Sequence, residues 1–234
     1  MRRPVKPLFR DEELVLRWLP GTTPRLVVVF TGMKRGVGGE TLDEFAASAS
    51  CGGENAVLFV TDRRITWFAA PGLWARTVDM IREIIEAEGI EEVITLGNSM
   101  GGYAAMLLPR DIPVRRAIAF APQITMDREI LDDARWPDVK SEWGDLPVRN
   151  LADTVSETRT HYFAFASRDC AEDVAHLDLL PRQPRMHRFL LASDRHNPAR
   201  TLKEKGVLGR VVAAIVRGRR QHVAGLLEKT GIAA

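Results

Sequence analysis

Residues 93–106, with the sequence VITLGNSMGGYAAM, constrain the fold of this chain more than any other segment. Ser99 stands between Gly97 and Gly101, after an apolar run that predicts a strand and before a run that predicts a helix. A serine on so sharp a turn needs small residues two positions before and after it, because the bent backbone leaves no room for side chains. The segment therefore predicts a nucleophile elbow with Ser99 as the candidate nucleophile.

Short β-branched runs alternate with helical periodicity along the rest of the chain. Strands buried on both faces and joined by helices predict an α/β fold, with a doubly wound, mostly parallel sheet flanked by helices. The first run precedes the turn sequence PGTT, which predicts an antiparallel N-terminal edge strand in a hairpin. The predicted strands are residues 14–19, 25–30, 56–60, 91–96, 116–120, 161–166 and 186–191, and the predicted helices are 42–49, 78–87 and 207–229.

Composition points to one ordinary globular domain over residues 1–234, because 45% of the residues are hydrophobic and no linker or repeat divides the chain. The 33 basic and 31 acidic residues nearly cancel, so the charge makes no case for nucleic acid. Cys51 and Cys170 form no metal or redox pattern, and no run approaches the roughly 18 apolar residues of a membrane span. We expect a cytoplasmic protein without metal or cofactor, and homo-oligomerisation stays open.

A nucleophilic serine requires a histidine base and a carboxylate that orients it. His196 follows the last predicted strand in a short loop, at the edge of the sheet where α/β proteins gather their chemistry. The favoured carboxylate is Asp169, which directly follows the strand 161–166, with Glu172 and Asp173 as alternatives in the first turn of the next helix. The resulting order along the chain is serine, acid, histidine.

This order of elements and of triad positions resembles the α/β-hydrolase fold, over most of the chain from about residue 25 onward. The blocks TLGNSMGGYAAM, AFAPQ and FVTDRRITWF resemble those of small bacterial hydrolase-like proteins of poorly known substrate. The resemblance implies a serine hydrolase that cleaves a small ester or thioester through an acyl-enzyme. Alternatives are acyl transfer on the same triad and a non-catalytic ligand-binding protein.

The loop FTGMKRGVGGE closes the second predicted strand, residues 25–30. An α/β-hydrolase supplies one oxyanion donor at this place. The resemblance implies the backbone N–H groups of Met33 and Met100 as donors, although the HG-type sequence of many lipases is absent. Glycines within residues 32–39 also allow a phosphate cradle. A P-loop would require Gly-Lys-Ser/Thr where the chain has Gly39, Glu40 and Thr41, which disfavours nucleotide binding.

Two further regions bear on the substrate. Arg63 and Trp67 follow a predicted strand and could line the site, with a solvated arginine and a packed tryptophan as the structural alternative. The stretch from about 123 to 160 separates two strands, and connections of that length tend to be lids or binding segments. We therefore expect a small cap insertion there.

Overall fold

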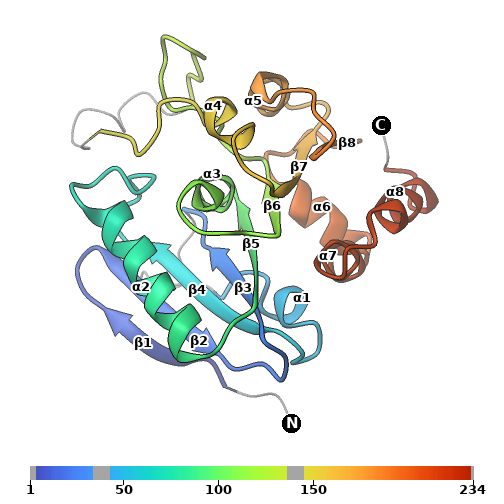
Figure 1. The fold of residues 1–234 in the computed structure, drawn as a ribbon. Helices are drawn as coiled ribbons and strands as arrows, with labels where there is room; N and C mark the ends of the chain where they lie inside the picture. Colours follow the sequence, from blue (N-terminus) through green and yellow to red (C-terminus); the bar gives the residue numbers. More distant parts are fainter. Residues whose placement is uncertain (1–3, 34–42, 136–144, 233–234) are drawn as a thin grey trace.

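The computed structural model describes residues 4–33, 43–135 and 145–232. Within these ranges the chain forms an eight-stranded sheet with helices on both faces (Figure 1). The strands are β1 (Lys6–Arg10), β2 (Leu14–Leu19), β3 (Arg25–Phe30), β4 (Ala56–Asp62), β5 (Glu92–Asn98), β6 (Arg116–Phe120), β7 (His161–Ser167) and β8 (Met186–Leu191). The helices are α1 (Ala46–Ser50), α2 (Leu73–Ala87), α3 (Met100–Leu107), η2 (Leu108–Arg110), α4 (Leu151–Val155), α5 (Ala171–Leu179), α6 (Pro198–Glu204), α7 (Leu208–Val216) and α8 (Arg220–Lys229). None of these helices is long and apolar enough to cross a bilayer.

The strand order is β1-β2-β4-β3-β5-β6-β7-β8. Strands β3 to β8 pair in parallel with one another. Strands β1 and β2 add an antiparallel edge beside β4. This confirms the predicted mostly parallel α/β sheet and its antiparallel N-terminal edge. The hairpin partner of β2 is the preceding strand β1. The PGTT turn leads instead to β3, which does not pair with β2, because β4 lies between them.

The predicted helix over 207–229 is wrong in one respect, because the chain breaks it into α7 and α8. The break falls at Gly218, whose φ of 72° ends α7 in the left-handed region that glycine tolerates. The helix predicted over 42–49 begins only at Ala46, since Phe45 has a φ of 60°. The first residue of that prediction, Leu42, lies outside the described residues.

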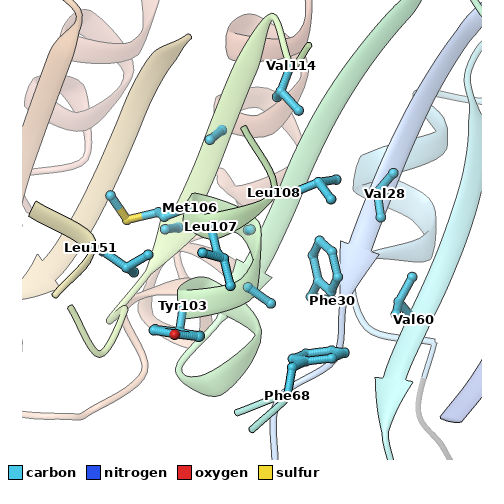
Figure 2. Packing of buried hydrophobic residues seen from close by; sticks show 14 of the residues in the cluster. Val28, Phe30, Val60, Phe68, Tyr103, Met106, Leu107, Leu108, Val114 and Leu151 are labelled. Carbon is cyan, nitrogen blue, oxygen red and sulfur yellow. The ribbon is translucent and has the colours of Figure 1, made fainter. Parts of the chain in front are cut away.

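Alternation along the buried strands builds a core on each face of the sheet. On β3, Val28 and Phe30 belong to the cluster under α2 and α3, while Val27 and Val29 belong to the cluster under α7 and α8. Figure 2 shows part of the first cluster, in which the rings of Phe30 and Phe68 meet edge to face with centroids 5.7 Å apart. At about 1.5–3 kcal/mol for each large side chain, burial on both faces holds the sheet firmly between its helices.

The described parts of the expected cap segment pack beside α3. Leu151 N donates to Ile124 O at 2.9 Å, and Tyr103 Oη donates to Val148 O at 3.2 Å. Figure 2 shows Leu151 and Tyr103 on neighbouring parts of the same cluster. The first contact joins two parts of the segment to each other and the second attaches it to α3. Its function as a cap stays a prediction.

The chain reverses its direction of strand addition at β3, whose neighbours are β4 on one side and β5 on the other. Ligand sites in open α/β sheets lie outside the carboxyl ends of the strands at such a reversal. Thr31 leaves β3 there, and Ser99 leaves β5. The loops after β6, β7 and β8 open on the same edge, so the ends of five neighbouring parallel strands meet there.

Candidate active site

Ser99 lies on the turn between β5 and α3, with φ 56° and ψ −121°. A Cβ on Gly97 would lie 2.0 Å from Gly101 O, and a Cβ on Gly101 would lie 2.1 Å from Phe30 O. The strand-to-helix turn predicted from the sequence is therefore present, and its two glycines are required by contact with backbone. A non-glycine residue held at positive φ costs about 1–3 kcal/mol, which the close packing around the turn must offset.

His196 contacts Ser99 directly. Its Nε2 lies 3.0 Å from Ser99 Oγ, within hydrogen-bond distance. His196 follows β8 and immediately precedes Asn197, whose side chain caps α6 by accepting from Arg200 N. The cap fixes the end of the loop, so the imidazole reaches Ser99 from a supported backbone.

The carboxylate beside His196 belongs to Asp173, whose Oδ1 lies 2.6 Å from His196 Nδ1. The preference for Asp169 is therefore corrected. The loop after β7 is tied to the loop after β8 by Asp169 N donating to Ser193 O, and the Asp169 side chain is 53% exposed and paired with Arg168. Asp173, in the first turn of α5, is 1% exposed and faces inward. An acid in the first helical turn is also stabilised by the helix dipole.

Arg135 makes a second contact with the same carboxylate oxygen. Its Nη1 lies 2.8 Å from Asp173 Oδ1 and 3.0 Å from His196 Nδ1. Burial raises the pKa of Asp173, but the hydrogen bonds and positive charges of His196 and Arg135 outweigh that effect and hold the pKa below its usual range. Asp173 is thus kept ionised in a buried position.

Asp133 holds the other edge of the Arg135 guanidinium. Its Oδ1 accepts from Nε at 2.8 Å and its Oδ2 accepts from Nη2 at 2.6 Å, a bidentate pair. Buried His176 adds a contact between Nε2 and Asp133 Oδ2 at 3.1 Å, and its Nδ1 accepts from Ile124 N. Burial raises the pKa of Asp133, yet the His176 and Arg135 hydrogen bonds lower it overall. A continuous chain of polar contacts therefore joins His176 to Ser99.

Gln123 approaches Ser99 from the loop after β6. Its Nε2 lies 3.1 Å from Ser99 Oγ, and its Oε1 accepts from Trp67 Nε1 at 3.2 Å. The indole donor fixes which end of the amide is the acceptor, so Nε2 faces the serine. Gln123 and Trp67 are both completely buried.

The segment after β4 supports Trp67 through Asp62. The Asp62 carboxylate accepts backbone N–H groups from the turn that follows it, including those of Ile65, Thr66 and Phe68. Trp67 has a φ of 53° within this turn. The turn therefore places the buried indole within hydrogen-bond distance of Gln123.

The contacts of Arg63 and Trp67 match the structural alternative, and a role of either residue toward a substrate stays a prediction. The Arg63 guanidinium donates to Asp11 O, and Arg63 N donates to Glu13 O, so this residue ties β4 to the β1–β2 turn. Trp67 is buried among the first core cluster. In the part of the chain that the structure describes, Trp67 reaches Ser99 through Gln123.

One group of side chains has the composition of a metal site. The ligand atoms of Cys170, Asp173 and His196 lie within 4.8 Å of one another. Arg135 Nη1 occupies the space between them, at 3.7 Å from Cys170 Sγ. Burial also raises the pKa of the Cys170 thiol, which disfavours the thiolate that a metal needs. These side chains surround the Arg135 guanidinium, which takes the place that a metal ion would need.

The implied oxyanion donors lie on either side of the reversal at β3. Met100 is the first residue of α3, directly after Ser99, and Met33 follows the end of β3 and is half-buried. Next to Met33 in the chain, Gly32 N donates to Glu44 Oε2 at 2.9 Å. The glycine-rich stretch 32–39 falls mostly outside the described residues, so the phosphate-cradle alternative is not addressed by the structure.

Sequence reasoning did not identify Arg135, Asp133, His176 or Gln123 as parts of this site. Gln123 carried the clearest signal, a polar residue three positions after the end of a buried strand. His176 resembled a helical surface histidine, and Arg135 stood in a charged stretch with no local pattern. Their roles depend on contacts between segments that are distant in sequence.

An open, mostly parallel sheet with a serine elbow, a histidine after the last strand and a buried acid between them defines the α/β-hydrolase fold. This chain has that fold. No protein-family model and no curated protein matches it. Solved structures do match, and those named here share so few identical residues that the likeness concerns the fold alone.

Three of these structures illustrate the likeness. The capsule O-acetyltransferase of Neisseria meningitidis serogroup A is 14% identical with a TM-score of 0.62, over 88% of this chain and 93% of that one. A sugar hydrolase (YeeB) from Lactococcus lactis is 14% identical with a TM-score of 0.59, over 95% and 100%. Mycobacterium tuberculosis MPT51 (FbpC1) is 15% identical with a TM-score of 0.59, over 91% and 99%.

Proposed function

We propose that this protein is a serine hydrolase that cleaves a small ester or thioester through an acyl-enzyme intermediate. The observation that carries the proposal is the unbroken hydrogen-bonded chain from Ser99 Oγ through His196 to Asp173 Oδ1, with distances of 3.0 and 2.6 Å. The elbow supports it, because a strained serine at a strand end is a costly arrangement without a chemical use. Hydrolases among the similar folds are consistent with the proposal.

In the first half-reaction, Ser99 Oγ attacks the carbonyl carbon while His196 Nε2 takes the serine proton. Asp173 accepts the Nδ1–H of His196, which fixes the tautomer and stabilises the imidazolium. The backbone N–H groups of Met100 and Met33 would stabilise the oxyanion, Met100 with the added help of the α3 N-terminus. The tetrahedral intermediate then collapses, and His196 donates the proton to the leaving group.

In the second half-reaction, water loses a proton to His196 and attacks the acyl-enzyme, which releases the acid and restores Ser99. The His196 side chain is partly exposed, at 29%, so the acyl acceptor, which is water in hydrolysis, can reach the ester carbonyl beside it. A second candidate function, acyl transfer, differs only in this acceptor. The similarity to a capsule O-acetyltransferase, also solved in complex with CoA, is the observation that favours it.

Labelling with a fluorophosphonate, followed by a panel of esters of increasing acyl length, tests the proposal. We expect a single labelled serine, Ser99, and loss of both labelling and turnover in Ser99→Ala with folding intact. The exposed Ser156 provides a matched control, since Ser156→Ala should change neither. Turnover that persists in Ser99→Ala would exclude the serine mechanism. Acyl acceptors added to the assay distinguish transfer from hydrolysis, and retention on immobilised nucleotide tests the non-catalytic alternative.

A further inference from the structure

We propose that Asp133 is a counter-charge that lets Arg135 hold the triad carboxylate without opposing protonation of His196. The inference rests on the proposed function, because it assigns two positioning residues to the same triad. It follows from how two groups, the Arg135 guanidinium and the His196 imidazole, share one oxygen atom of Asp173. Neither residue touches Ser99 in the structure, so both act through Asp173 and His196.

Arg135 Nη1 and His196 Nδ1 both contact Oδ1 of Asp173, at 2.8 and 2.6 Å. The other oxygen, Oδ2, is buried with no hydrogen-bond partner among the described residues. The guanidinium and the imidazole therefore compete for the negative charge at a single atom. Arg135 orders the carboxylate, but every gain in its attraction to Oδ1 weakens the attraction left for His196.

The competition sharpens when His196 takes the serine proton. The resulting imidazolium is a cation whose Nδ1 lies 3.0 Å from Arg135 Nη1. Two cations at that distance in a partly buried site repel strongly unless a further negative charge offsets them. Arg135 alone would therefore oppose the proton transfer on which the reaction depends.

Asp133 supplies the missing negative charge. Its two oxygens accept hydrogen bonds from Nε and Nη2 of Arg135 at 2.8 and 2.6 Å, and Nη1 remains to donate to Asp173. Two carboxylates against one guanidinium leave one negative charge on the cluster. The imidazolium of His196 then neutralises the cluster instead of making it positive.

Among the described residues, none of the other groups that face this cluster pairs with the Nε and Nη2 edge of Arg135. The N–H of Ile124 donates to His176 Nδ1, so a proton on His176 sits at Nε2, where it serves Asp133, and the ring is neutral. Cys170 approaches Arg135 Nη1 at 3.7 Å as a neutral thiol, since burial raises its pKa. Glu172 contacts the thiol from the exposed side. Asp133 is the group placed to offset Arg135.

The test compares Asp133→Asn, Arg135→Gln and the double variant, with Asp132→Asn as a matched control. Asp132 is the neighbouring acid, but its side chain is 67% exposed and pairs with Arg128 on the surface. Two quantities are measured for each protein: the rate constant for phosphonylation of Ser99, and the pH midpoint at which the His196 ring protonates, followed by NMR. Circular dichroism and thermal melting identify variants that are not folded.

Asp133→Asn should lower the His196 midpoint by about one pH unit and slow labelling about tenfold, because the variant removes the negative charge that offsets Arg135, whose Nη1 lies 3.0 Å from His196 Nδ1. The double variant restores the net negative charge, so its midpoint should return toward that of the wild type and its labelling should exceed that of Asp133→Asn. Asp132→Asn should change neither quantity.

A purely structural role for the pair predicts that the variants lose stability and labelling while the His196 midpoint stays that of the wild type. That result, or an unchanged midpoint in Asp133→Asn, would overturn the proposal. The NMR midpoint can be measured without turnover, so it tests the role of Asp133 even if the protein is not a hydrolase. Failure of Ser99 to label in the wild type would instead overturn the hydrolase proposal.

Discussion

The indole Nε1 of Trp67 donates a hydrogen bond to Oε1 of Gln123 across 3.2 Å, and both side chains are fully buried. This contact aims the Gln123 amide nitrogen at Ser99 Oγ. Trp67→Phe keeps most of the ring and removes the donor, so the amide loses its fixed orientation. We expect kcat to fall about three- to tenfold, the value of a hydrogen bond of roughly 1 kcal/mol.

Trp74→Phe is the matched control for that measurement. The Trp74 indole also donates to a side chain, Asp111 Oδ2 at 2.9 Å, but neither residue contacts Ser99. This variant should lower the melting temperature and leave kcat unchanged. Equal effects of both substitutions on kcat would show that Trp67 acts through general stability.

Asp173→Asn should reduce kcat by roughly 10³-fold or more, because an amide cannot hold the imidazole in the productive tautomer. Asp169→Asn provides the comparison, since that side chain is exposed and pairs only with its neighbour Arg168. We expect its kcat to stay within about twofold of the wild type. Steady-state kinetics on the best ester would identify Asp169 as the orienting acid if the two results were reversed.

Gly101→Ala should destabilise the protein by at least about 2 kcal/mol, because its Cβ would lie 2.1 Å from Phe30 O and the backbone must move. Gly225 is a suitable control, since a Cβ there meets nothing within 4 Å in helix α8. Gly225→Ala should stabilise by about 0.5–1 kcal/mol. Urea denaturation of the two variants measures both effects, and a neutral Gly101→Ala would contradict the elbow geometry.

His187 should make stability depend on pH. Burial lowers the pKa of this residue to about 4, with help from the charges of Arg220 and His161. Its usual value is about 6.5, so between the two values the unfolded chain binds more protons than the folded one. The stabilisation is complete above about pH 6.5 and is lost as the pH falls toward 4.

Thermal melts between pH 4 and pH 8 check this expectation. His187→Phe keeps the ring that packs on Phe163 and removes the titrating group, so the acid slope of the melting temperature should become shallower. His222→Gln, on the exposed face of α8, should leave the slope as it is. A slope that His187→Phe does not alter would assign it to other groups.

The strands of the central sheet were predictable because each is a short apolar run that needs no distant partner to be recognised. The run 25–30, RLVVVF, is buried on both faces, and its ends coincide with those of β3. β1 escaped prediction, since KPLFR is mostly exposed and alternates weakly. It becomes a strand by pairing with β2, which is a tertiary effect.

The candidate site divides in the same way. Ser99 was predictable from the glycines on either side of it, and His196 from its position directly after a strand. Both are local properties of the sequence. The choice between Asp169 and Asp173, four positions apart, depended on which of the two side chains points toward His196. The loop after β7 holds the Asp169 backbone against the loop after β8, and Asp173 follows in the first turn of α5. Arg135 reaches the triad across 38 positions of sequence, and no local pattern encodes such a meeting.

The outer strand β1 affects how copies of this protein behave at high concentration. It carries Lys6, Pro7 and Arg10, and its register with β2 shifts between Pro7 and Phe9. Charge, a missing N–H donor and an irregular ladder each discourage a foreign strand from extending a sheet. Self-association by edge-to-edge strand addition, a common route to aggregation, is therefore opposed on this side of the molecule.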